Sequence, residues 1–483
     1  MKPLLPALLC VGLSCAGTAA GEDVYLGLRR AGLQPIPVAI PPFSGEAEGT
    51  TDPIPTLRSV LIADLEFSVL VEPVTDPSGR YRSRYSATVD KLRGLLGRGE
   101  DVAETVARPD TSMWAERSEL LRDTVPFPVV WERAGVGIAL SVRIDPPTEA
   151  GSGRRSLGFE LSFIGGGPPL AQGGRVLGPD NARAVAHEIA DEVVLAAAGE
   201  PGIATSRIAY ALPGEGNARR IVVADYDGAQ SVAIGCSDDE ALMPSFFPGR
   251  SRLACIRYGE KGPDLVTYTI PPLGHAETLL SARPGLESTP AVSPDGSEVA
   301  FTLNMKGNND IYVIASRGGD LRRLTFSPGI DTSPSWSPTG GQLVYTSDRS
   351  GTPSIYVMGR TGLAQRNLMV QPGYLDAAAW SPRGDRIAYV AREGGRFHVF
   401  TIDPLGGAPR RITDRGNNES PCWSPDGLHL IISSDRSGAS EIYTMRLDGS
   451  AVRRVAHTKG AITPTWSPPP RNQDPTIRKE ETE

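Results

Sequence analysis

The chain has 483 residues, which at roughly 150 residues per domain predicts two or three domains. Its 56 acidic and 49 basic residues leave a net charge of −7, which argues against a nucleic-acid-binding or polybasic membrane-surface protein. Glycine and proline make up about a fifth of the residues while 40% are hydrophobic, so the composition indicates a packed fold with many tight turns.

Residues 1–20 have the pattern of a secretory signal peptide. Lys2 supplies the positive start, a short apolar stretch follows at residues 4–13, and small residues at 18–20 suit cleavage. The stretch is too short to span a bilayer, and no later segment approaches eighteen unbroken apolar residues. We therefore expect an exported protein without membrane insertion. A lipoprotein signal at Cys15 is the weaker alternative.

Residues 21–200 are predicted to form a small α/β domain. Thr56 and Asp180 stand where a side chain could cap the start of a helix. The polar stretch 78–124 is expected to hold one or two short helices, and a turn-rich linker follows at residues 199–202. The remaining periodic patterns predict strands and helices at residues 37–40, 56–68, 138–144, 158–164 and 180–197.

A motif close to Trp-Ser-Pro-Asp-Gly recurs through the second half of the chain. Proline at the second position and glycine at the fourth favour a type I turn, and apolar strand patterns flank each copy. Four short strands in about 44 residues are typical of one β-propeller blade. The prolines of successive copies stand at positions 248, 294, 338, 382, 425 and 468.

The two ends of this repeat array complement each other. A strand pattern at residues 207–210 has no motif before it, whereas the last motif, at Trp466, has no strand after it. We therefore predict that residues 463–466 complete the first blade and close a six-bladed propeller over residues 201–470. A linear β-solenoid is the alternative. The remaining residues, 471–483, are expected to be a disordered tail.

Several residues that suggest chemistry have simpler structural explanations. Asp295 and Asp426 take the third position of the repeated turn, where other copies have Thr339 and Arg383, so turn formation is favoured over catalysis. The repeated tryptophans are expected to pack between blades rather than to bind sugars. The five histidines show no metal-binding spacing, and no Gly-x-Ser-x-Gly motif occurs. No metal or cofactor is therefore expected.

The arginines and cysteines leave alternatives open. Arg349 and Arg436 lie in matched loops, where local hydrogen bonds are favoured and binding of a carboxylate is the alternative. After signal removal, Cys236, Cys255 and Cys422 remain, an odd number at unrelated spacings. Buried free thiols are expected, and one disulfide is the alternative.

The export signal, the small α/β domain and the closing Trp-Ser-Pro motif together resemble the TolB family. The resemblance spans about residues 24–468, and in the first half it rests on residues 32–41, 62–66 and 207–210. The family comprises periplasmic components of the Tol-Pal system of Gram-negative envelopes. The resemblance implies a monomeric, non-enzymatic protein of the periplasm that supports outer-membrane integrity and envelope constriction at cell division.

The resemblance also implies two partner sites. The mouth of the propeller would bind Pal, the peptidoglycan-associated outer-membrane lipoprotein, and so limit the grip of Pal on peptidoglycan. A segment at residues 22–33, which includes Glu22, Asp23, Val24, Tyr25 and Leu26, would contact TolA of the inner-membrane complex. The residues that the family motif assigns to Pal are Glu287, Ser288, Thr289, Asp331, Thr332, Asp376, Glu419 and Thr463.

An enzyme is the rival hypothesis. An exported propeller hydrolase or lyase would use mouth carboxylates such as Asp331, Asp376 or Glu419, provided that their environments separate their pKa values. A glycan-binding propeller without catalysis is a further alternative.

Overall fold

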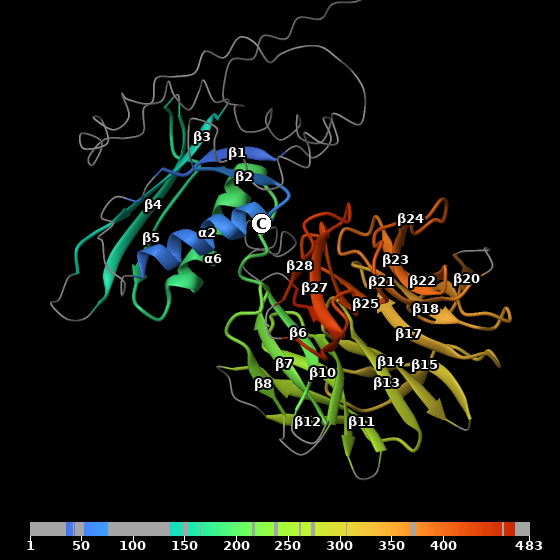
Figure 1. The fold of residues 1–483 in the computed structure, drawn as a ribbon. Helices are drawn as coiled ribbons and strands as arrows, with labels where there is room; N and C mark the ends of the chain where they lie inside the picture. The colour runs from blue at the N-terminus through green and yellow to red at the C-terminus, as the bar shows by residue number, and fades with distance from the viewer. Residues whose placement is uncertain are drawn as a thin grey trace, which may run out of the picture.

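The computed structural model describes residues 35–41, 43, 53–75, 136–147, 153–164, 166–214, 218–235, 240–259, 262–271, 276–305, 307–368, 373–455 and 458–468. They form a small α/β domain and a six-bladed β-propeller, which pack against each other (Figure 1). The expected signal peptide, the segments 22–33 and 78–124 and the tail 471–483 lie outside the described residues. Neither helix in the described ranges is long and apolar enough to cross a membrane.

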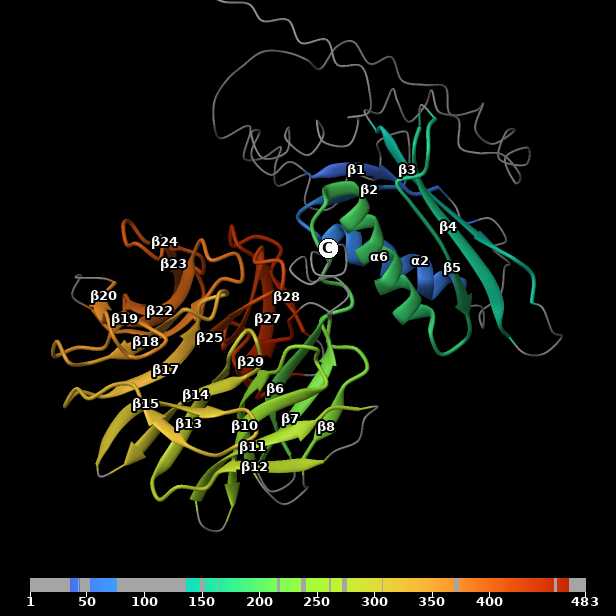
Figure 2. The same cartoon turned by 180° about the vertical axis from the view of Figure 1, so that it is seen from behind.

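The α/β domain consists of one five-stranded sheet with two helices, α2 (Ile54–Phe67) and α6 (Ala182–Ala198), packed together on its propeller side (Figures 1 and 2). The first strand pairs in parallel with two neighbours, and the other pairs are antiparallel. In sheet order the strands are β2 (Val71–Val74), β1 (Ile36–Ala39), β3 (Ile138–Ile144), β4 (Arg155–Phe163) and β5 (Ala171–Leu177).

Both helices form where predicted, but the two expected caps were wrong. Helix α2 begins two residues before Thr56, at Ile54. Pro55 suits its first turn, because the N–H groups of the first turn have no helical carbonyl to donate to and proline lacks this group. Helix α6 begins after Asn181, whose side-chain Oδ1 accepts the Gly178 N–H at 2.7 Å and so closes a turn that leaves Asp180 outside the helix. Neither helix has a side-chain cap hydrogen bond.

The propeller is built from six antiparallel sheets of four strands. The first strands of successive blades contact one another in a closed ring, so the linear β-solenoid is excluded. Blades 1 to 3 are β29 (Ile462–Trp466), β6 (Arg207–Pro213), β7 (Arg219–Asp225), β8 (Val232–Ile234); β9 (Glu240–Phe246), β10 (Arg252–Gly259), β11 (Gly262–Thr269), β12 (Glu277–Ser281); and β13 (Leu286–Val292), β14 (Glu298–Met305), β15 (Asn308–Ala315), β16 (Leu321–Arg323).

Blades 4 to 6 repeat this plan with shorter outer strands. They are β17 (Asp331–Trp336), β18 (Gln342–Ser347), β19 (Ser354–Gly359), β20 (Arg366–Asn367); β21 (Leu375–Trp380), β22 (Ile387–Glu393), β23 (Arg396–Ile402), β24 (Arg410–Arg411); and β25 (Asn418–Trp423), β26 (His429–Ser434), β27 (Glu441–Arg446), β28 (Arg453–Arg454).

Strand β29 closes the ring as predicted. It pairs antiparallel with β6, with Trp466 opposite Ile208. The Trp466 indole N–H donates to Ser206 Oγ at 2.7 Å, and the Ser467 N–H donates to the Arg207 carbonyl at 2.8 Å. The last inner strand is therefore held to the first blade by backbone and side-chain bonds.

The repeated turns and tryptophans also follow the predictions. Asp295 accepts hydrogen bonds from Ser293 and Ser297, so it completes the turn of its repeat. The tryptophans of the motif are buried, with exposed fractions of 5–8%. Cys255 and Cys422 are free thiols, and burial raises the pKa of both. Cys236 lies outside the described residues.

Candidate functional site

Each of the six inner strands bends close to its first residues. We call the end of the propeller at which these strands begin the mouth. Each strand carries one residue with a φ between 47° and 58°, a conformation that side-chain-bearing residues seldom adopt. Its repetition in every blade shows that the bend belongs to the blade architecture. The six residues are Met243, Thr289, Ser333, Ala377, Ser420 and Thr463.

The residue before each bend is half-buried or exposed. Pairing with the second strand shows that Ser288, Thr332, Asp376 and Glu419 occupy the same register, opposite Thr302, Thr346, Val390 and Ser433. Asp376 and Glu419 are therefore equivalent to Thr332, and not to Asp331. Blades 1 and 2 carry apolar side chains, Ile462 and Leu242, at this position.

Hydroxyl groups link neighbouring blades across this register. Thr302 Oγ1 lies 2.8 Å from Thr289 Oγ1 and donates to Thr332 Oγ1 at 3.2 Å, which joins blades 3 and 4. Thr346 Oγ1 donates to Asp376 Oδ1 at 2.9 Å and joins blades 4 and 5. The predicted hydroxyl residues are thus held in place by one another, so their geometry is set before any partner arrives.

The side of the mouth at blades 5 and 6 is acidic. Tyr374 donates its hydroxyl to Asp376 Oδ2 at 3.1 Å, and burial together with this carboxylate raises the pKa of Tyr374 to about 12. Burial, and then repulsion from Asp435 and Asp376, raises the pKa of Glu419. Two neighbouring carboxyl groups that repel each other favour a positively charged or hydrogen-bond-donating group between them.

Glu287 and Asp331, also predicted to contact the partner, are buried inside the blades. Glu287 is 1% exposed and accepts the Leu265 N–H at 2.6 Å as well as a bond from Ser281. Both oxygens of Asp331, which is 0% exposed, lie 3.0 Å from Nη2 of Arg349. Glu287 therefore links the inner strand of blade 3 to blade 2, and Asp331 fixes the inner strand of blade 4 to a loop of its own blade.

The matched arginines differ in their partners. Arg349 pairs with a carboxylate, but that carboxylate belongs to its own blade, and its guanidinium also stacks 4.9 Å from the Tyr356 ring centre. Arg436 has Asn418 in place of that carboxylate, at 2.8 Å. Both arginines donate from Nε to a serine two residues earlier, Arg349 to Ser347 at 2.8 Å and Arg436 to Ser434 at 3.0 Å. The local hydrogen bonds expected from the sequence are therefore present in both loops.

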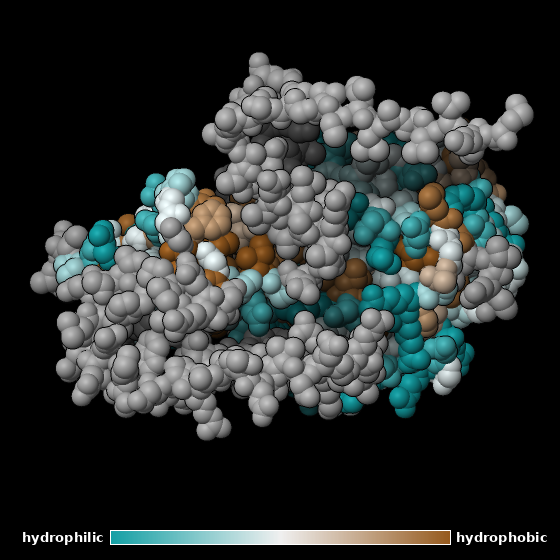
Figure 3. Space-filling view, turned by 90° about the horizontal axis from the view of Figure 1, so that it is seen from above, coloured by the Kyte–Doolittle hydropathy of each residue, from teal (hydrophilic) through white to brown (hydrophobic). Residues whose placement is uncertain are grey.

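Apolar side chains stand exposed around the mouth. They begin or directly precede the inner strands of blades 3 to 5, or lie in the loop that leads to blade 4. On a different side of the molecule, seen from above, Figure 3 shows hydrophobic patches among hydrophilic residues. This apolar rim consists of Leu286 (62% exposed), Phe326 (71%), Ile330 (48%) and Tyr374 (40%).

The α/β domain covers the other end of the propeller, where the repeated turns lie. The His429 ring, next to the turn of blade 6, stacks on Phe67 with centroids 4.4 Å apart and donates from Nε2 to the Phe67 carbonyl at 2.9 Å. Arg446 donates to the carbonyls of Glu66 and Ser68 at 2.9 and 3.1 Å. The mouth is thus left uncovered by the α/β domain in the described part of the chain.

A buried polar cluster also joins the two domains, and sequence reasoning missed it. His187 of α6 donates from Nδ1 to Asp64 Oδ2 at 2.7 Å, and Tyr226 donates to Asp64 Oδ1 at 2.7 Å. The three side chains lie on α2, α6 and the turn after β7, so no spacing along the chain brings them together. The only signal was a histidine with apolar neighbours on a predicted helix.

Comparison with known proteins agrees with this architecture. The family model described as the TolB beta propeller domain matches residues 196–470, more than half of the chain. The chain belongs to the TolB beta-propeller family. The crystal structure of TolB from Acinetobacter baumannii superposes with a TM-score of 0.69 over 90% of this chain and 97% of its own, at 22% identity, which shows the shared fold.

Two curated relatives are the Tol-Pal system proteins TolB of Anaeromyxobacter dehalogenans strains 2CP-C and 2CP-1. They are 32% identical over 327 and 329 residues, which are 66% and 67% of this chain. The matched region spans 64% of the length of each relative. The six-bladed TolB-like propeller predicted from the sequence is confirmed.

Proposed function

We propose that this protein is a non-enzymatic periplasmic component of a Tol-Pal system that binds Pal at the propeller mouth. The names of its curated relatives, its family and the expected signal peptide support this proposal. Through the segment 22–33 it contacts TolA, and by occupying Pal it supports outer-membrane integrity and constriction at division.

The single observation that carries the mouth assignment is its composition at the end that the α/β domain leaves open. Hydroxyl and carboxylate groups of the mouth that are already held by hydrogen bonds, which we call its floor, are bordered by exposed apolar side chains. Protein interfaces commonly combine a buried apolar contact with polar groups that fix orientation. The apolar rim supplies the former, and Thr332, Asp376 and Glu419 supply the latter.

The enzyme hypothesis finds less support in this arrangement. Asp331 is enclosed by its blade and paired with Arg349, so it has no open path to a substrate. Asp376 already accepts bonds from Thr346, Tyr374 and its neighbouring backbone. Binding Pal, and so limiting its contact with peptidoglycan, uses these same groups without requiring proton transfer.

Calorimetric titration with the soluble domain of Pal tests the mouth assignment. Leu286→Ser removes an exposed apolar side chain of the rim, and Leu405→Ser is the matched control, since Leu405 is 88% exposed in a turn at the opposite end. We expect Leu286→Ser to weaken binding by about tenfold, as for an interface residue worth about 1.4 kcal/mol. Equal affinities for both variants would show that Pal binds elsewhere.

The hydroxyl floor is tested by replacing Thr289 and Thr332 together with alanine. The double variant should fold, because each hydroxyl is only partly buried, and should bind Pal more weakly. Unchanged affinity would remove the floor from the site. For TolA, pull-downs with and without residues 22–33 should recover Pal with both forms and TolA only with the longer one.

A further inference from the structure

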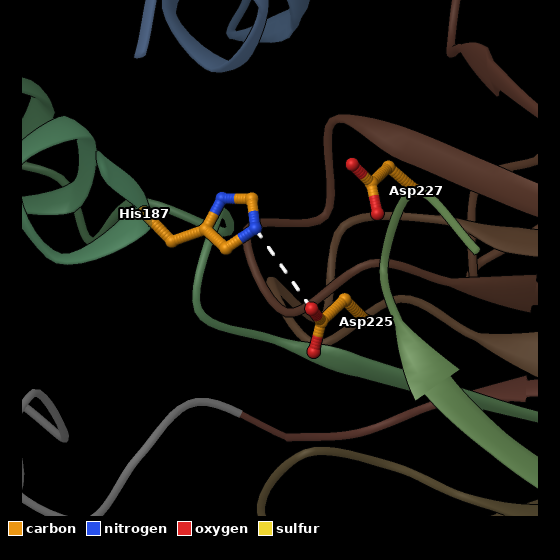
Figure 4. Close-up of side chains that lie close together, drawn as sticks. All are labelled: His187, Asp225 and Asp227. Atoms are coloured by element: carbon orange, nitrogen blue, oxygen red, sulfur yellow. Dashed lines mark ion pairs between the residues drawn. The ribbon is translucent and has the colours of Figure 1, made fainter. Parts of the chain in front are cut away.

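Three potential metal ligands meet at the boundary between the two domains (Figure 4). His187 projects from α6, Asp225 ends β7, and Asp227 lies in the turn that follows. Nε2 of His187 and one carboxylate oxygen of each aspartate all lie within 4.8 Å of one another. The cluster lies far from the mouth, at the end of the propeller that the α/β domain covers.

The orientation of the His187 ring is fixed by Asp64, which binds the ring nitrogen that faces away from the two aspartates. Its Nδ1 donates to Asp64 Oδ2 at 2.7 Å, so the carboxylate holds the ring with Nε2 pointing to the aspartates. Nε2 is 4.0 Å from Asp225 Oδ2 and has no hydrogen-bond partner among the described residues, although His187 is only 4% exposed. A buried ring nitrogen without a partner is costly unless something binds it.

This arrangement is the one that metal-binding histidines show in other proteins. A ligating histidine usually donates its other ring nitrogen to a carboxylate, which fixes the tautomer and makes the free nitrogen a better ligand. Asp64 has that role here. Asp225 and Asp227 both lie near His187, where Arg183 contacts Asp227 and Arg207 also acts on Asp225.

We propose that His187 Nε2, Asp225 and Asp227 bind one divalent transition-metal ion, Zn²⁺ by preference. One imidazole nitrogen and two carboxylates form a donor set that suits Zn²⁺, whereas Ca²⁺ and Mg²⁺ favour oxygen ligands alone. Zinc bonds of about 2.0–2.1 Å place tetrahedral ligands about 3.4 Å apart. The ligand atoms, of which the His187–Asp225 pair is 4.0 Å apart and all lie within 4.8 Å, therefore need to close by about 0.6 to 1.4 Å, and water completes the coordination.

The bound ion would connect the two domains. His187 belongs to the α/β domain, while both aspartates belong to blade 1 of the propeller. Arg183 is the competitor, because its guanidinium contacts Asp227 Oδ2, while Oδ1 accepts the Ala229 N–H at 3.0 Å. Metal binding must displace Arg183 from one oxygen or share the carboxylate with it.

Titration of the tag-free, metal-depleted full chain with Zn²⁺ tests the site. Calorimetry should give one high-affinity site per chain, and Co²⁺ should give the visible absorption of a tetrahedral complex. Asp227→Asn removes one ligand, and we expect it to weaken Zn²⁺ binding by at least about tenfold. Arg183→Ala removes the competitor but no ligand, so its affinity should equal or exceed that of the unsubstituted chain.

Asp448→Asn is the matched control. Asp448 occupies the equivalent turn of blade 6 and accepts the Ser450 N–H at 2.8 Å, as Asp227 accepts the Ala229 N–H. The Asp448→Asn variant should bind Zn²⁺ with the affinity of the unsubstituted chain. Every variant keeps all other histidines. Absence of stoichiometric binding in the unsubstituted chain, or equal binding by the Asp227→Asn and Asp448→Asn variants, would overturn the proposal. Neither result depends on whether Pal binds the mouth.

Discussion

The same turn position serves two purposes in different blades. Asp295 and Asp426 both accept hydrogen bonds from the serine and the backbone of their turns. The Asp295 side chain is 53% exposed, whereas that of Asp426 is 6% exposed and lies 3.2 Å from the His429 ring. Since His429 also contacts Phe67, this turn aspartate supports the contact between the domains.

Asp426→Asn should therefore destabilise the protein much more than Asp295→Asn. Although burial alone would raise it, His429 and Ser424 hold the pKa of Asp426 below its usual range. The stabilisation is present above about pH 4 and is lost as the pH falls further. Urea unfolding at pH 7 should show a loss of about 3 kcal/mol for Asp426→Asn, as for a broken buried pair.

The free energy of unfolding measured at acid pH gives the control for this prediction. The Asp426→Asn variant should lose less stability than the unsubstituted chain between pH 5 and the onset of acid unfolding. Equal losses for the two turn variants at pH 7 would mean that the pair with His429 contributes nothing.

The buried tryptophans are equivalent in sequence but not in hydrogen bonding. The Trp423 indole donates to the Ala379 carbonyl at 2.9 Å, whereas Trp380 Nε1 is buried without a partner in the described part of the chain. Trp423→Phe should therefore cost about 1 kcal/mol more than Trp380→Phe, the net value of one hydrogen bond. Parallel urea unfolding of both variants measures the difference, and identical losses would contradict it.

At the level of whole elements, local patterns were sufficient for most of the propeller. The proline turn and the two-residue strand period repeat in each blade, so turns, strands and ring closure could be predicted. The burial of Asp331 could not be predicted, because it depends on a pair with Arg349, which lies 18 positions further along the chain in another loop of the blade. Likewise, the start of α2 depends on Pro55 in its first turn rather than on the capping preference of Thr56.

Ring closure by β29 should be essential for a cooperative fold. A chain that ends before residue 462 lacks the inner strand of blade 1, together with the bonds from Trp466 and Ser467. Thermal unfolding should lose its single sharp transition in this variant. A chain that ends at residue 468 keeps the strand and should melt like the full chain, and similar melting of the two truncations would contradict this role.

On the scale of the whole molecule, the α/β domain and the propeller share one hydrophobic cluster and one buried polar cluster. The polar contacts between the domains join residues that are far apart in the chain, such as His187 and Asp64 at 123 positions and His429 and Phe67 at 362 positions. No periodicity in the sequence could reveal such pairs. These buried contacts favour movement of the two domains as one body.

Tyr226→Phe tests this coupling. It removes the hydroxyl that donates to Asp64 and leaves a buried acceptor short of one bond, which should cost about 1–3 kcal/mol. Amide exchange in α2 and α6 should accelerate. Tyr345→Phe is the control, since the Tyr345 hydroxyl bonds Gln365 within blade 4 at 3.2 Å, and it should leave exchange in the helices unchanged. Equal exchange in both variants would show that the two domains are not coupled here.

The distance along the chain between Ser206 and Trp466, 260 residues, has a consequence for biogenesis. A polypeptide that emerges from its amino end exposes the free edge of β6 until β29 has been made and delivered. During that interval the unpaired edge is a template for aggregation. The growing chain must therefore be kept apart from its neighbours until residue 466 has been made and β29 has paired with β6.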